Sequence, residues 1–84
     1  MNIPCQVCSV TSTTGEVKPL WCRFKNEEGE IIKLTIISVR PAGVGSIHAR
    51  FYECTAEAES GTSCLFKLSL DPGTQKWAIV EKKF

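Results

Sequence analysis

The chain has 84 residues, a formal net charge of +1 and five cysteines, so it has room for one domain with one core. The near-neutral charge argues against a strongly electrostatic partner such as duplex DNA. No run approaches the roughly 18 apolar residues of a membrane span, and no basic start followed by an apolar stretch indicates a secretory signal. Because an odd number of cysteines leaves at least one thiol outside any intrachain disulfide, we expect reduced thiols and a cytoplasmic protein.

Alternation of apolar and polar residues recurs along the chain, and no segment has the spacing of an amphipathic helix. Residues 18–25 and 30–40 are predicted to form a hairpin around an acidic turn in which Gly29 supplies a positive φ. Pro41 removes a backbone donor and is expected to end the second strand.

Three further strands are predicted downstream, at residues 47–55, 63–70 and 76–82, the last two joined by the turn Asp71-Pro72-Gly73-Thr74. Residues 1–17 are either an N-terminal arm or an extra strand, and residues 18–84 form the β-meander core of the single domain. We therefore predict an all-β fold, a five- or six-stranded antiparallel meander that forms a strongly bent sheet or a small open barrel.

Successive side chains on a strand point to opposite faces, so alternation assigns a predicted core. That core contains Leu20, Cys22, Phe24, Ile32, Leu34, Ile36, Ile47, Ala49, Phe51, Cys64, Phe66, Leu68, Leu70, Trp77 and Ile79. The opposite face is basic and aromatic, whereas most acidic residues fall in the turns. A neutral total therefore hides an uneven charge distribution.

The motif with the clearest chemical spacing is the C-x-x-C pair of Cys5 and Cys8. A closed zinc site needs four ligands, and the chain supplies one such pair. A redox pair would need a following helix to lower the thiol pKa, and residues 9–16 do not form one. We interpret the two as ordinary thiols and expect no cofactor, with a zinc-stapled β domain through Cys5 and Cys8 as one alternative.

Catalysis is not predicted, because nucleophilic chemistry needs a nucleophile, a base and an orienting group in reach of one another. His48 is the one histidine, and it lies six positions from Cys54, on the order of 20 Å along a strand. We therefore predict that the protein is not an enzyme.

Two surfaces are candidate binding sites. An apolar cluster near one end of the outer face predicts a binding or assembly module, with an unknown protein or a second copy of the chain as partner; it contains Tyr52, Cys54, Leu65, Ala78 and Val80. The basic and aromatic residues of the same face resemble the stacking platforms and cations of small barrels that bind single-stranded nucleic acid, which is the other alternative; they are Trp21, Arg23, Lys33, Arg50, Tyr52 and Lys67.

Three stretches of the chain, RFKNEEGE, VRPAGVGSIHARFYEC and GTQKWAIVEK, carry a resemblance to a group of short bacterial all-β proteins of uncharacterised function. The resemblance covers the chain from Lys18 onward, and its motifs are turn and core residues. It implies a bacterial source and a compact β domain, and it carries over no functional residues.

Overall fold

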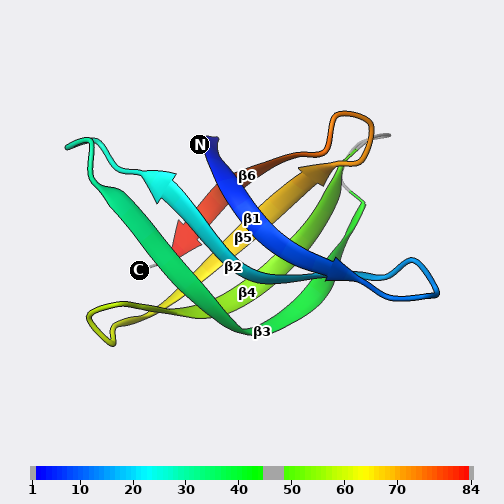
Figure 1. Cartoon of the computed structure of the whole chain (residues 1–84), viewed down its shortest axis with the longest axis horizontal. Coiled ribbons are helices and arrows are strands. Elements are labelled where there is room, and N and C mark those ends of the chain that lie inside the picture. Colours follow the sequence, from blue (N-terminus) through cyan, green and yellow to red (C-terminus); the bar gives the residue numbers. More distant parts are fainter. Residues whose placement is uncertain (1, 45–48, 84) are drawn as a thin grey trace.

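The computed structural model describes residues 2–44 and 49–83, and within them the chain forms a closed antiparallel barrel in meander order (Figure 1). Its strands are β1 (Ile3–Thr11), β2 (Val17–Lys25), β3 (Ile31–Val44), β4 (Arg50–Ala58), β5 (Ser63–Asp71) and β6 (Lys76–Lys83). Each strand pairs with the next, and β1 closes the barrel by pairing Ile3–Cys5 with Trp77–Ile79 of β6. The all-β meander is confirmed, and the N-terminal segment supplies the sixth strand.

Two of the tight turns form where the sequence predicts them, between β2 and β3 and between β5 and β6. In the β2–β3 turn, Gly29 adopts a φ of 80°, and the Asn26 side chain accepts hydrogen bonds from the backbone N–H groups of Glu28 and Glu30. In the β5–β6 turn, the carboxylate of Asp71 accepts a hydrogen bond of 2.9 Å from the Gly73 N–H. Both side chains replace partners that the turning backbone lacks.

The interior is filled mainly by β2, β4 and β5, whose inward side chains are almost fully buried. The buried core comprises Cys22, Phe24, Leu34, Tyr52, Cys54, Ala56, Cys64, Phe66, Leu68, Leu70 and Ile79. Partly buried residues pack against it, among them Ile32, Ile36 and Trp77, whose ring centroid lies 5.8 Å from that of Tyr52. The predicted core residue Ile47 lies outside the described residues.

The predicted face of β4 is wrong. Alternation placed Ala49 and Phe51 inside, but both are only half-buried, whereas Tyr52 and Cys54 are buried. Directly paired residues share a face, and Cys54 pairs with Phe66, an inward residue of β5. Both sets of alternate residues on β4 include apolar side chains. Pairing with β5, where apolar and polar residues alternate clearly, therefore decides which set is buried.

Leu20 is also misassigned as a core residue, because it is 36% exposed and its neighbour Pro19 is fully buried. Cys8 pairs with Trp21 and Ser9 with Pro19, so the register of β1 and β2 skips Leu20. A bulge of this kind shifts the alternation by one residue.

Strands β2 and β3 pair only between Trp21–Lys25 and Ile31–Thr35 within the described residues. Beyond these pairs they spread apart, as Figure 1 shows for the segments leading away from their shared turn. Residues 17–20 of β2 stay paired with β1, and residues 36–44 of β3 stay paired with β4. The barrel wall is therefore split on this side.

Across the described part of the chain, no helix has the length and apolar character to cross a membrane.

Candidate functional site

The split in the barrel wall opens into a cavity of about 820 Å³, which we call the β2–β3 cleft. Its lining comes from the end of β1, the β1–β2 turn, the start of β2, and the facing parts of β3 and β4. Apolar side chains contribute from all four strands: Val10, Val17, Val39, Pro41, Phe51 and Tyr52. A concave surface with mainly apolar walls is the usual setting of a binding site.

Exposed hydrophobic side chains gather at the same place. Val10 lines the cleft and is 50% exposed, while Leu20 and Ile37 lie within two positions of the last β2–β3 pair and are 36% and 59% exposed. Leu20 and Ile37 each occupy an irregularity of the ladder. The two bulges thus turn the apolar side chains of Leu20 and Ile37 toward solvent beside the point where β2 and β3 stop pairing.

The charged residues lining the cleft are Glu16, Lys18 and Arg50. Arg50 pairs in register with Val44 and Leu70, at the end of the barrel. Within residues 2–44 and 49–83, neither Lys18 nor Arg50 forms a side-chain hydrogen bond or an ion pair. An uncompensated cation beside an apolar wall favours a ligand that carries a negative group.

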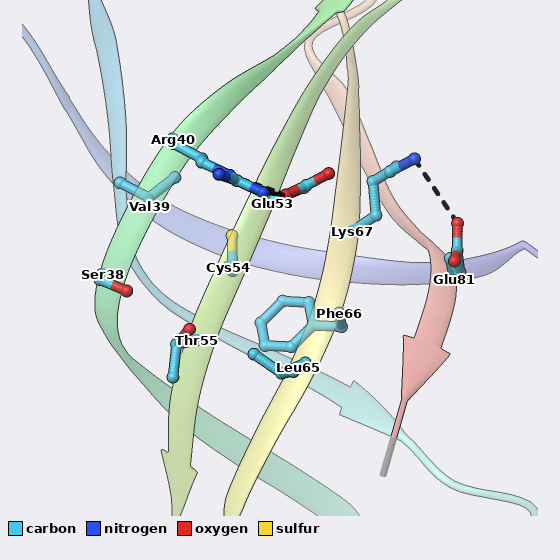
Figure 2. A pocket seen from close by; sticks show the side chains of 10 residues that line it. All are labelled: Ser38, Val39, Arg40, Glu53, Cys54, Thr55, Leu65, Phe66, Lys67 and Glu81. Carbon is cyan, nitrogen blue, oxygen red and sulfur yellow. Dashed lines mark hydrogen bonds and ion pairs between the residues drawn. The ribbon is translucent and has the colours of Figure 1, made fainter.

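A second depression, of about 640 Å³, lies on the outer surface of β3 to β6 (Figure 2). Across it runs a row of paired residues with alternating charge: Arg40, Glu53, Lys67 and Glu81. Arg40 Nε donates a hydrogen bond of 2.8 Å to Glu53, and Lys67 Nζ lies 3.5 Å from Glu81 Oε2. We call these four residues the charge row; because its charges cancel, it exerts little attraction on a distant ligand.

The apolar cluster predicted from the sequence is not assembled. Tyr52 and Cys54 are buried in the core, which corrects their placement on the outer face. Leu65 is 51% exposed, but Ala78 pairs with Ser69, four positions along β5. Lys67 of the charge row stands between these two positions. Val80 is half-buried at the irregularity of the β5–β6 ladder.

The residues predicted to bind nucleic acid divide into two groups. Trp21, Arg23 and Lys33 lie together, with Lys33 Nζ 4.8 Å and Arg23 Cζ 5.7 Å from the Trp21 ring centroid. We call these three the Trp21 cluster; Gln6 supports it by accepting a hydrogen bond from Arg23 Nε. The other three lie elsewhere: Tyr52 in the core, Lys67 in the charge row and Arg50 at the cleft.

Cys5 and Cys8 point to opposite faces of β1. Cys5 pairs with Trp77, which packs against the core, whereas Cys8 pairs with Trp21 on the outer face. Residues three positions apart on a regular strand point to opposite faces, so these two thiols do not converge on one metal ion. Among the described residues, no group of three or more His, Cys, Asp and Glu side chains is arranged to hold a metal. His48 lies outside those residues.

Four thiols from four strands instead face the barrel interior: Cys5, Cys22, Cys54 and Cys64. Burial raises the pKa of Cys5 to about 11 and the pKa of Cys54 and Cys22 to about 12; the neighbouring thiols Cys5, Cys54 and Cys64 add to the effect on Cys22. Cys64 Sγ donates to the Ala56 carbonyl at 3.6 Å. Since the thiolate is the reactive form, these protonated thiols act as small apolar core residues.

Comparison with protein-family models, with curated proteins and with solved structures found no match to the chain. The chain is therefore a small all-β barrel protein of 84 residues for which no family is identified. The resemblance to short bacterial β proteins stays a prediction.

Proposed function

We propose that the protein is a small, non-catalytic binding or assembly module of the cytoplasm that recognises a protein partner through the β2–β3 cleft. The observation that carries the proposal is the divergence of β2 and β3, which leaves an apolar cleft in the wall of an otherwise closed barrel. A domain of this size has little apolar surface to spare for its own stability. Apolar side chains exposed together at one place favour an interaction surface, and five free thiols support a reducing compartment.

The proposal predicts that partner binding depends on apolar residues at the cleft and not on equally exposed apolar residues elsewhere. The immobilised protein should capture a defined set of proteins from the source-cell lysate, and Val10→Glu and Ile37→Glu should each reduce that capture at least tenfold. Ile37 lies two positions past the last β2–β3 pair, whereas Ile31 and Leu65, which are 61% and 51% exposed, neither line the cleft nor lie beside the point where β2 and β3 stop pairing. Ile31→Glu and Leu65→Glu are therefore matched controls that should retain capture, as quantified by mass spectrometry.

Loss of capture in Leu65→Glu with full capture in Val10→Glu would place the interface on the outer face and contradict the proposal. A second copy of the chain is the partner if light scattering shows a dimer that Val10→Glu and Ile37→Glu convert to a monomer. Circular dichroism of each variant separates loss of the interface from loss of the fold.

Single-strand nucleic-acid binding is the second candidate function, and the Trp21 cluster is the observation that favours it. A fluorescent oligonucleotide titrated at low salt should bind weakly, and Trp21→Ala should weaken binding about 5- to 160-fold, because base stacking contributes about 1–3 kcal/mol. Added salt should weaken it further. Lys67→Gln, in the charge row, should change little. Flat titration curves at high protein concentration would remove this candidate.

A further inference from the structure

The β2–β3 cleft is bordered by two strand edges that have no neighbouring strand in the described part of the chain. On β2, residues 17–20 pair with β1 along one edge, and on β3, residues 36–44 pair with β4 along one edge. The opposite edges of both segments face the cleft. An unpaired edge presents N–H and C=O groups that an additional strand can satisfy.

The two edges differ in how well they can accept a strand. The free segment of β2 contains Pro19, which has no N–H, and its register is broken beside Leu20. On β3, Pro41 and the irregularities at Ile37 and Ala42 leave Ser38–Arg40 as a regular stretch, in which each residue pairs directly with one residue of β4. The edge of β3 at Ser38–Arg40 is therefore the better template.

We infer that the cleft takes an extended segment of the partner protein, which adds as a strand to β3 at Ser38–Arg40 and places an acidic side chain at Arg50. The inference rests on the proposed function and specifies its partner chemistry. Main-chain hydrogen bonds to the edge supply affinity in such complexes, and alternate side chains supply specificity. Here the alternate side chains that face the interior contact Val39 and Val17, so they are apolar.

The acidic residue follows from the charges of the cleft. Arg50 has no ion-pair partner among the described residues. A guanidinium can donate two parallel hydrogen bonds to one carboxylate, which makes an acidic side chain a well-matched partner. Arg50 pairs with Val44, six positions after Ser38, which is on the order of 20 Å along β3. A segment of about seven residues reaches from Ser38 to Arg50, and a peptide of about 12 residues is long enough to contain it with flanking residues on both sides.

A displayed library of random 12-residue peptides, selected against the whole protein, provides the probe. The selected peptides should carry apolar residues at alternate positions and one Asp or Glu near one end, and they should bind with a Kd that fluorescence anisotropy can measure. N-methylation of the peptide backbone separates strand addition from side-chain docking. Methylation at one set of alternate residues should weaken binding at least tenfold, while methylation at the other set should change it less than threefold.

Arg50→Glu should weaken the acidic peptides at least tenfold, and replacing the peptide's acid by lysine should restore binding to that variant. Lys25→Gln is the control, because Lys25 lies at the end of β2 away from the cleft. Its Kd for the peptides should stay within twofold of the wild-type value. Amide NMR shifts on peptide addition should centre on Ser38–Arg40.

Each other result has a defined meaning. Peptides that bind the cleft but tolerate methylation at both sets of positions overturn strand addition and leave the proposed function in place. Selection of no peptide, or of peptides unaffected by Arg50→Glu, overturns this inference, while the capture experiment judges the proposed function independently. A chain that dimerises through the β3 edge makes a second copy the occupant and likewise overturns the inference.

Discussion

Replacing Phe66 by alanine should unfold most of the protein or bring it close to unfolding, whereas the same change at Phe51 should be mild. Phe66 is 4% exposed and pairs with buried Cys54 in the centre of the barrel. Truncating a buried phenylalanine costs about 3–5 kcal/mol, and a chain of this length has a total stability on the order of 4–13 kcal/mol. Urea titration followed by circular dichroism measures the loss directly.

Phe51 is the matched control, because alternation along the sequence predicts that both Phe51 and Phe66 are core residues. It is half-buried, pairs with Ser69 and lines the cleft rather than the core. We expect Phe51→Ala to cost about 1 kcal/mol, the typical value for a substitution outside the core. A large loss at Phe51 with a small loss at Phe66 would contradict the face assignment of β4 in the structure.

The sequence predicts most of the strands and turns of this fold because the signals for them are local, but the expectation that Pro41 ends its strand is wrong, since Pro41 pairs with Tyr52 and β3 runs on to Val44. Gly29 and Asp71 mark their turns through their own backbone and side-chain chemistry, and alternation identifies the inward residues of β5 without ambiguity. The face of β4 is not a local property. Apolar residues occupy both of its parities, so the buried set depends on which residues of β5 lie opposite.

The cleft was not predicted, and the reason is physical. It exists because β2 and β3 stop pairing after Trp21 and Thr35, next to irregularities at Leu20 and Ile37. A bulge leaves a weak trace in alternation, and its consequence for a neighbouring strand appears only when the strands are paired. The exposed apolar residue Ile37, directly after Ile36, is a local signal that interrupts the alternation in the middle of β3.

The predicted sites illustrate the same limit. Trp21, Arg23 and Lys33 come together because they lie on two strands joined by one short turn, whose register the sequence nearly determines. The candidates that depended on more distant pairing, Tyr52 and Cys54, are buried instead. The spacing of Cys5 and Cys8 indicates a shared site only in a tight turn, and on a strand it separates the side chains.

Alkaline pH should destabilise the protein strongly, because the interior thiols must stay protonated in the folded state. Burial raises the pKa of Cys22 and Cys54 from 9.0 to about 12. Below pH 9 both thiols are protonated in the folded and the unfolded chain, so the stability is fully present. Between pH 9 and about 12 only the unfolded chain releases these protons, and stability falls by about 1.4 kcal/mol per thiol and pH unit.

Urea titrations at intervals from pH 8 to 11 measure this loss of stability, and a variant shows how much of it a single thiol causes. Cys54→Val removes one ionisable group with a small change in volume, so its stability should decline less steeply with pH than that of the wild type. An equal slope for wild type and Cys54→Val would show that this thiol titrates alike in both states, and would contradict its burial in the barrel.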